Sequence, residues 1–458
     1  MIQERIAVVD PFSGRLVGEV PVMSREAVQA ALDDGAAFRY QLDRHERSTL
    51  LFAVAEHIAD DADRLAALIS SESGLCLRDT RHEVQRGRDV FRTAAMEALR
   101  DDGEAFACDV SAIGRRRRAI THREPVRLAA AITPFNHPLN QVAHKVAPAI
   151  AAGTPIVLKP SERTPLAALW LLDALAECGL PHDAVQLVTG DPREIGAAML
   201  DHPAVEVVLF TGSVGVGKAI TAGLGYRRAV LELGGNDPLL VLDGAGIERA
   251  AELAASGAFA NSGQRCTAVK RIIVLESLAD ELARAVAERA ALLVTGDPLD
   301  ERTDVGTVIS EDAAIEIEGR IRDAVAGGAR LLAGGDRRGA QIEPAVLDHV
   351  RPEMEVVARE TFGPVAPILR VRDADEAIAL ANATSYGLSA GVVTSELELA
   401  VRCARELRCG TVNIDEVPGF RTELTPFGGI GDSGLGVKEG VRETIRALTN
   451  GKLVSFPW

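Results

Sequence analysis

Long apolar runs are missing from this sequence. None approaches the roughly 20 consecutive residues that a membrane-spanning helix needs. The start of the chain, Met1-Ile2-Gln3-Glu4-Arg5, carries charge where a secretory signal peptide has an apolar core. We therefore expect a soluble protein of the cytoplasm, with no membrane as partner.

Paired cysteines are missing as well. The six cysteines are scattered without CxxC spacing, which indicates neither a disulfide framework nor a zinc site, and we expect no metal centre. One of them, Cys266, stands in a distinctive sequence context. The others are most simply buried or incidental thiols: Cys76, Cys108, Cys178, Cys403 and Cys409.

An excess of positive charge is also missing. The chain has 50 Lys and Arg residues against 66 Asp and Glu, a formal net charge of −16. This balance disfavours nucleic acid or an anionic membrane surface as a partner, so an anionic ligand would need a local basic pocket. Four consecutive arginines, Arg115 to Arg118, are interpreted as a solvated or subunit-contacting ribbon. At 458 residues the chain is too long for a single core and is expected to form two or three domains that enclose a cleft.

A cysteine after a small polar turn is the first feature with chemical potential. The stretch Asn261-Ser262-Gly263-Gln264-Arg265-Cys266-Thr267 follows an alanine-rich run and would present the Cys266 thiol at a turn. The neighbouring Arg265 is a cation of the kind that lowers a thiol pKa. Upstream, Glu232 is a lone carboxylate between two leucines, where a raised pKa would suit a general base.

The order of the expected elements indicates an α/β fold. Residues 24 to 105 are predicted to be helical, with Ser24 as a cap and one helix over Arg47–Leu68. Strands and helices then alternate from Leu128, the pattern of a parallel sheet with crossover helices. Thr164 is expected to cap a helix that has Pro165 at its first position.

A glycine-rich turn follows the predicted strand Val205–Thr211. Strand, turn and helix in this order suit a pyrophosphate at a helix N-terminus. The turn, Gly212-Ser213-Val214-Gly215-Val216-Gly217-Lys218, does not fit GxGxxG, so a tight structural turn is an equal alternative. The segment Lys452–Trp458 is expected to form a strand that pairs with a neighbouring subunit or with the arm around the four arginines.

Four motifs occur in one order along the chain. Two of them surround Cys266 and Glu232; the others are Thr133-Pro134-Phe135-Asn136-His137-Pro138 and Glu360-Thr361-Phe362-Gly363-Pro364. Together they resemble the aldehyde dehydrogenase superfamily from about Asp10 to the C-terminus. The resemblance implies a Rossmann-type NAD-binding domain (1–106 and 124–234), an α/β catalytic domain (235–425), and a small β oligomerisation arm with a C-terminal strand (107–123 and 440–458) that forms a homodimer or homotetramer.

The resemblance also implies a reaction. Cys266 would attack an aldehyde, and the Asn136 amide with the Cys266 N–H would hold the oxyanion of the thiohemiacetal. Hydride transfer to a nicotinamide would leave a thioester, and Glu232 would activate water to release the acid, since family members that release acyl-CoA lack this glutamate. Purely structural roles for Asn136 and Glu232, and a non-catalytic protein on the same fold, are the alternatives.

Cofactor residues are carried over by position in the family pattern. Lys159 and Glu162 match adenosine-ribose contacts, and the glutamate favours NAD, with NADP possible. Ser213 matches a pyrophosphate contact, and Glu360 with Phe362 matches the nicotinamide-ribose platform. The remaining expected cofactor residues are Thr133, Pro134, Ser161, Gly212 and Gly217.

Aromatic residues make up only 4% of the chain, with two Trp and three Tyr, which argues against a pocket for large apolar aldehydes. The segments around Asn136, Glu232 and Val417–Gly429 resemble the phosphonoacetaldehyde and phosphonoformaldehyde dehydrogenase branch. The leading hypothesis is thus oxidation of a small phosphonoaldehyde; a semialdehyde, lactaldehyde or glyceraldehyde 3-phosphate is the alternative. The Arg86 side chain either points into the substrate cleft or snorkels from the apolar face of its helix to solvent. The expected substrate residues are Arg265, His137, Arg421, Arg86 and Thr267.

Overall fold

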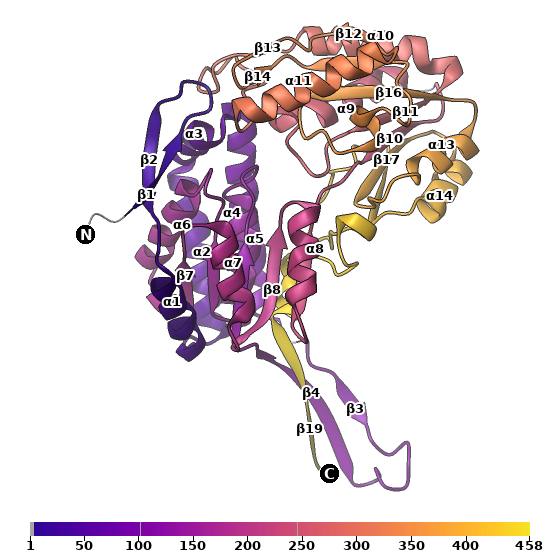
Figure 1. Cartoon of the computed structure of the whole chain (residues 1–458). Helices are drawn as coiled ribbons and strands as arrows, with labels where there is room; N and C mark the ends of the chain where they lie inside the picture. Colours follow the sequence, from indigo (N-terminus) through magenta and orange to yellow (C-terminus); the bar gives the residue numbers. More distant parts are fainter. Residues whose placement is uncertain (1–3, 101, 245) are drawn as a thin grey trace.

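A hairpin and a layer of helices begin the chain. The computed structural model describes residues 4–100, 102–244 and 246–458, so Met1 to Gln3 of the charged start lie outside the described residues. Figure 1 shows the hairpin at the outer edge of the helical layer, against which the later elements pack. These first elements are β1 (Arg5–Val9), β2 (Leu16–Pro21), α1 (Arg25–Ala37), α2 (Arg44–Asp60), α3 (Ala62–Ser73) and α4 (Leu77–Ala98).

Two expectations for this layer have different outcomes. The Ser24 cap is confirmed, because its hydroxyl accepts the Ala27 N–H at 3.3 Å. The single helix over Arg47–Leu68 is wrong, because the chain breaks at Asp61 (φ −109°, ψ 16°) into α2 and α3. Both helices bury apolar residues against α4, so the apolar spacing continues across the break and conceals it.

A five-stranded parallel sheet forms the next layer. Its order is β7-β6-β5-β8-β9, and its crossover helices cover both faces. The strands are β5 (Leu128–Ile132), β6 (Ile156–Lys159), β7 (Val185–Leu187), β8 (Val205–Thr211) and β9 (Arg228–Glu232). The helices are α5 (Asn140–Ala152), α6 (Leu166–Glu177), α7 (Pro192–Asp201) and α8 (Val214–Gly223).

The expected cap of α6 is wrong. Thr164 makes no cap, and its hydroxyl instead donates to the Phe135 carbonyl at 3.2 Å. The Glu72 carboxylate on α3 accepts the Leu166 N–H at 2.7 Å and the Ala167 N–H at 3.0 Å. A side chain more than ninety residues upstream thus satisfies the free N–H groups of this helix.

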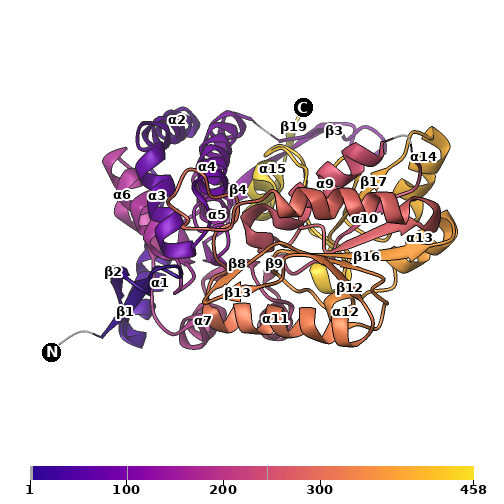
Figure 2. The same cartoon turned by 90° about the horizontal axis from the view of Figure 1, so that it is seen from above.

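A seven-stranded sheet follows, in the order β12-β15-β16-β11-β10-β17-β18. Six strands run parallel, and only the β12–β15 pair is antiparallel. Figure 2 shows this lobe beside the first one. Its strands are β10 (Pro238–Val241), β11 (Arg271–Leu275), β12 (Arg330–Ala333), β15 (Ala345–Asp348), β16 (Val365–Val371), β17 (Ser389–Val393) and β18 (Thr411–Ile414). The helices are α9 (Ile247–Phe259), α10 (Glu276–Ala291), α11 (Glu311–Ala326), α12 (Glu355–Ala358), α13 (Ala374–Ala381) and α14 (Leu397–Glu406), and a short hairpin is formed by β13 (Arg337–Arg338) and β14 (Gln341–Ile342).

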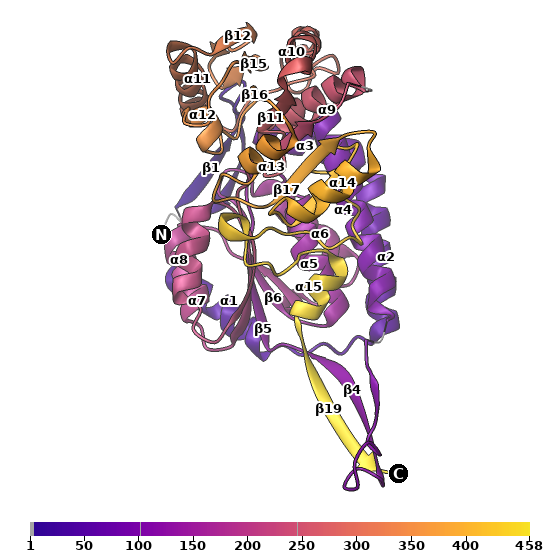
Figure 3. The same ribbon diagram turned by 90° about the vertical axis from the view of Figure 1, so that its right-hand side faces the viewer.

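A three-stranded arm projects from the body (Figures 1 and 3). It contains β3 (Ala105–Ala107), β4 (Arg117–Pro125) and β19 (Thr449–Pro457), which follows α15 (Val441–Ala447). The predicted pairing of the C-terminal strand with the arm is confirmed, since β19 runs antiparallel to β4 along its whole length.

The two main sheets meet at opposite ends of their strands. The carboxyl ends of β8 and β9 lead to Thr211 and Glu232, whereas Cys266 and Glu360 precede β11 and β16. The expected α/β architecture, with a Rossmann-type sheet, a second α/β unit and a β arm, is confirmed. The first sheet ends at Glu232 and the second begins at Pro238, while the domain limits themselves stay a prediction. Within the described residues, no helix combines the length and the apolarity needed to cross a bilayer.

Candidate active site

The Cys266 turn has an unusual backbone. Asn261, Ser262 and Gly263 all adopt positive φ (57°, 52° and 70°), a conformation that costs free energy for the two non-glycine residues. At Gly263 a Cβ atom would lie 2.0 Å from the Gly363 carbonyl oxygen, so the turn packs directly on the Glu360–Pro364 loop. Two of the sequence motifs therefore touch through their backbones.

The thiol itself is held in its neutral form. Burial raises the pKa of Cys266 to about 11, although the positive charges of Lys270 and Arg421 oppose this shift. The expectation that a neighbouring cation would lower the thiol pKa is thus outweighed by desolvation. The Cys266 thiol must lose its proton, or the charges around it must change, before it can react as a nucleophile.

Glu232 is the candidate general base for the water that would hydrolyse the thioester. The residue is 2% exposed, and within the described part of the chain neither carboxylate oxygen has a hydrogen-bond partner. A Cβ atom at Gly428 would lie 2.6 Å from Oε1, so only glycine permits this close approach. Burial and then the negative charge of Glu439 raise the pKa of Glu232 well above its ordinary value. The raised pKa expected from the sequence is confirmed in direction.

Charged residues that the sequence analysis missed surround this carboxylate. Lys145 forms an ion pair with Glu439 and donates to the Thr211 hydroxyl at 2.8 Å. Lys438 donates to the main-chain carbonyls of Gly410 and Gly428. A signal was available for Lys145, because it lies in a helix whose other residues are mostly apolar, and a buried lysine needs a partner.

Asn136 reaches the thiol turn. Its Nδ2 donates to the Gln264 carbonyl at 2.7 Å, two residues before Cys266. An amide carries two N–H groups, so the second remains for another acceptor. The structure therefore brings the expected oxyanion donor to the loop that carries Cys266. Gly235 packs against the same loop, where a Cβ added at this glycine would lie 2.5 Å from the Cys266 carbonyl oxygen.

The expected cofactor residues line the carboxyl ends of β5, β6 and β8. The Lys159 ammonium is 3.0 Å from the Glu162 carboxylate, which is 41% exposed and available to a ligand. Lys159 lowers the pKa of Glu162 although burial opposes the shift, so this carboxylate is charged. Ser161 accepts the Arg163 N–H at 3.2 Å, and Thr133 has a buried hydroxyl without a partner among the described residues. Pro134 follows it.

The glycine-rich turn packs closely and caps a helix. Ser213 is the N-cap of α8 and accepts the Val216 N–H at 3.5 Å. A Cβ at Gly212 would lie 2.6 Å from the Phe210 ring, and one at Gly217 would lie 2.5 Å from Leu233. The free N–H groups of α8 and the unpartnered Thr133 hydroxyl fit the phosphates of a dinucleotide. The tight packing at this turn is established, and the pyrophosphate contact stays a prediction.

Glu360 and Phe362 lie on the loop that packs on the thiol turn. The Glu360 carboxylate accepts the Gly235 N–H at 3.2 Å and lies 3.1 Å from the Lys270 ammonium. Phe362 has a positive φ of 53°, and its ring contacts that of Phe135 edge-on at 5.9 Å between centroids. The loop therefore joins the predicted cofactor side to the thiol.

A cavity of about 730 Å³ opens between α4, α9 and the Val417–Leu424 loop. The expected residues Arg86, Arg265 and Arg421 line it, together with His82 and Arg92, which the sequence analysis did not identify. Arg92 forms an ion pair with Glu56 at 3.6 Å. Burial lowers the pKa of Arg265 and Arg421, an effect that proximity to Arg86 reinforces. Thr267 is buried behind the loop, where a Cβ at Gly419 would lie 2.6 Å from its hydroxyl.

The three arginines differ in their partners. Arg86 donates to Glu423 at 2.8 Å, and His144 contacts the same carboxylate at 2.7 Å, so the charge of Arg86 is already neutralised. Arg421 stacks on the Phe427 ring at 4.1 Å. Among the described residues, neither Arg265 nor Arg421 forms an ion pair with a carboxylate. The latter two are the cations open to an anionic ligand.

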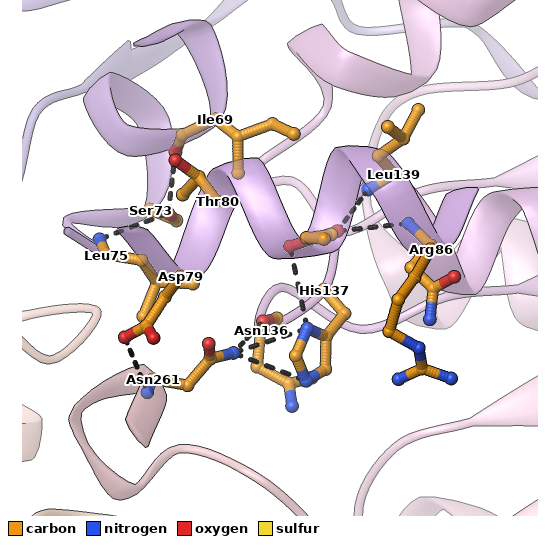
Figure 4. A network of polar contacts seen from close by, with 12 residues as sticks. Ile69, Ser73, Leu75, Asp79, Thr80, Arg86, Asn136, His137, Leu139 and Asn261 are labelled. Atoms are coloured by element: carbon orange, nitrogen blue, oxygen red, sulfur yellow. Dashed lines mark hydrogen bonds and ion pairs between the residues drawn. The ribbon is translucent and has the colours of Figure 1, made fainter. Parts of the chain in front are cut away.

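His137 differs from its expected place. It does not line the cavity formed by the described residues. Its ring lies 3.5 Å from the Glu83 carboxylate and 3.3 Å from the Asn261 amide, and Figure 4 shows it pointing toward Asn261. Glu83 also accepts the Leu139 N–H at 2.8 Å. In this structure His137 contacts the turn that precedes Cys266, and its role toward the substrate stays a prediction.

Comparison with known proteins agrees with this geometry. The family model described as "Aldehyde dehydrogenase family" matches residues 2–454. The 3-sulfolactaldehyde dehydrogenase of Priestia aryabhattai is 35% identical over 98% of this chain and 94% of its own. The lactaldehyde dehydrogenase of Methanococcus vannielii is 35% identical over 99% of this chain and 97% of its own.

A solved structure matches equally well along the chain. The NADP-dependent glyceraldehyde-3-phosphate dehydrogenase of Bacillus halodurans C-125, complexed with NADP, has a TM-score of 0.96 and 37% identity, and the match covers 99% of this chain and 96% of that one. The nucleophile turn, the buried carboxylate and the dinucleotide-type sheet all lie within the matched region. The chain is an enzyme that belongs to the aldehyde dehydrogenase family.

Proposed function

We propose that this enzyme oxidises a small anionic aldehyde to its carboxylic acid with NAD. One observation carries the proposal: Arg265 and Arg421 line the cavity next to the Cys266 turn, and among the described residues neither forms an ion pair. Asp79 favours the charge of Arg265, and Glu439 and Glu423 favour that of Arg421, only from a longer distance. Two desolvated guanidinium groups are costly unless an anion joins them. In a protein of net charge −16, such a pair is a specific feature and not a consequence of composition.

The residues provide each proton and bond change of the reaction. The Cys266 thiol gives its proton to solvent and Sγ bonds to the aldehyde carbon, while the second amide N–H of Asn136 is available to the resulting oxyanion. The residues predicted to hold a nicotinamide dinucleotide, among them Lys159, Glu162 and Glu360, would place a hydride acceptor beside that carbon, and loss of the hydride would leave a thioester on Cys266. Glu232 takes a proton from water, the hydroxyl adds to the thioester carbon, and the carbon–sulfur bond breaks to release the acid.

The cofactor is a nicotinamide dinucleotide, and we propose NAD as the preferred form. The charged Glu162 carboxylate would accept hydrogen bonds from ribose hydroxyls and repel a 2′-phosphate. Its ion pair with Lys159 moderates this repulsion, so NADP stays possible. The structural relative from Bacillus halodurans was solved with NADP, which supports keeping both forms in the test.

The substrate class is broader than the phosphonoaldehydes suggested by the sequence. The relatives described above are named for a sulfonated hydroxyaldehyde, a hydroxyaldehyde and a phosphate ester. They support the alternative, a small anionic or hydroxy aldehyde, better than a phosphonate specialist. We therefore propose the broader class, with a phosphonoaldehyde as one candidate within it.

NADH formation across a panel of aldehydes tests the proposal. The panel pairs sulfolactaldehyde, phosphonoacetaldehyde, succinic semialdehyde and glyceraldehyde 3-phosphate with neutral lactaldehyde and propionaldehyde. Replacing Arg265 by Met should lower kcat/KM for the preferred anion roughly 10- to 100-fold, since a charge-assisted hydrogen bond contributes about 1.5 to 3 kcal/mol. The neutral aldehydes should change little. Arg338→Met, at an arginine outside the site, is the control. Equal losses on charged and neutral substrates would overturn the anionic assignment.

We also propose that the arm assembles the chain into a homodimer or homotetramer in the cytoplasm. The support is the exposed apolar surface of the arm, including Val110 (88% exposed), Ile113 (94%) and Leu453 (62%). Light scattering should show an oligomer for the full chain. A monomeric wild-type enzyme would contradict this part of the proposal.

A further inference from the structure

Lys270 lies at the junction between the thiol turn and the cofactor side. Its ammonium group donates to the Cys266 carbonyl and lies 3.1 Å from the Glu360 carboxylate. Its own N–H donates to the Asp237 carbonyl at 3.0 Å. The residue is 5% exposed, so these polar contacts replace water almost entirely.

The residue type is informative in this chain. Only six of its 50 basic residues are lysines. A lysine ammonium is a compact charge that can contact a carbonyl and a carboxylate together, whereas the planar guanidinium of arginine needs more room. Space is limited here, because a Cβ added at Gly234 would lie 2.3 Å from the Glu360 carboxylate. A compact cation at position 270 is therefore consistent with the geometry.

We propose that Lys270 is a positioning residue that ties the Cys266 turn to Glu360, so that the charge of Glu360 controls how readily the thiol reacts. The proposal rests on the proposed function, in which Cys266 is the nucleophile and Glu360 belongs to the cofactor side. It adds a link between these two residues that neither motif contains.

The charges that face the thiol define the expected effect. Lys270 and Arg421 favour the thiolate, and Asp237 and Glu360 oppose it. In the structure Glu360 neutralises much of the Lys270 charge through their ion pair. Removing the lysine should therefore make the thiol less reactive. Removing the Glu360 charge should make it more reactive, because one opposing charge disappears and the ammonium is released from its partner.

Alkylation of the cofactor-free enzyme by iodoacetamide measures this effect without turnover. The rate is followed from pH 6 to 10 (roughly the range in which perturbed thiols titrate) by mass spectrometry of the peptide that contains Cys266, since other cysteines also react. For Lys270→Met we expect a rate about 10-fold lower at neutral pH, equivalent to about one unit in thiol pKa. For Glu360→Gln we expect a rate about 10-fold higher. Lys270→Arg should restore part of the loss.

The opposite signs separate positioning from a merely structural role. A lysine that only supports the fold would lower the rate or the melting temperature in both variants. Lys452→Met, which removes an ion-paired lysine on the arm, is the matched control and should leave the alkylation rate unchanged. Equal rates in wild type and Lys270→Met, or a slower rate in Glu360→Gln, would overturn the proposal. If the wild type failed to oxidise any aldehyde, the proposed function would fail, and the alkylation result would still stand.

Discussion

The Lys145–Glu439 ion pair beneath Glu232 is expected to set the pH at which the thioester is hydrolysed. Glu439 raises the pKa of Glu232 after burial, and Lys145 lowers it. A general base acts only when deprotonated, so hydrolysis increases as pH rises through the Glu232 pKa. Glu439→Gln removes the repulsion and leaves Lys145 without its partner. Both effects lower the Glu232 pKa, which moves the acidic limb of the rate profile to lower pH.

The magnitude follows from the position of these groups. All three are buried, where charges interact more strongly than at the surface. We expect a shift of about one pH unit, or about 1.4 kcal/mol in the proton affinity of Glu232. Lys145→Met should move the limb by a similar amount in the opposite direction. Breaking a buried ion pair also costs about 3 to 5 kcal/mol of stability, so each single variant should melt earlier than the Lys145→Met/Glu439→Gln double variant.

The assay isolates hydrolysis of the acyl-enzyme. One equivalent of aldehyde is mixed with enzyme and excess NAD, and the decay of the thioester is followed by quenching and mass spectrometry across the pH range. Melting temperatures at each pH exclude unfolding as the cause. Limbs that shift in the same direction for both single variants, or that do not shift, would refute the argument that this pair tunes Glu232.

Three further outcomes are expected. Cys266→Ala should abolish oxidation while NADH still binds, as measured by fluorescence titration; near-normal turnover would remove the central assignment. Glu232→Gln should release about one equivalent of NADH and then stall, because hydride transfer precedes the step that needs the base; absence of both burst and acyl-enzyme would place Glu232 earlier in the reaction. Glu162→Ala should narrow the preference for NAD over NADP, and unchanged kcat/KM for both cofactors would show that this residue does not contact the ribose.

Sequence reasoning located elements whose causes are local. The bounds expected for β8 agree with the structure because this strand is a short apolar run between turn residues. It failed where the cause is distant. The cap of α6 comes from Glu72, far upstream, and the break at Asp61 lies within a continuous apolar pattern. No local signal in the sequence marks either feature.

The same distinction applies to the site. Its motifs were visible because the nucleophile turn and the Glu232 segment each need several particular residues in sequence. The pairing of the tuning charges was not visible, because Lys145 and Glu439 are 294 residues apart and meet only in the folded chain. The contact of His137 with Glu83 was not visible for a related reason: Glu83 comes from α4, which the motif does not contain.

Burial of charge is the physical property that unites these features. Glu232 is made basic by desolvation, the thiol is kept neutral by the same effect, and neither Arg265 nor Arg421 forms an ion pair among the described residues. Each state is costly in the resting enzyme. An anionic aldehyde would relieve the cost at the arginines, and its own binding energy would then be available to place the carbonyl carbon at Cys266. A neutral aldehyde offers no such compensation, which is why the charged and neutral members of the substrate panel should separate.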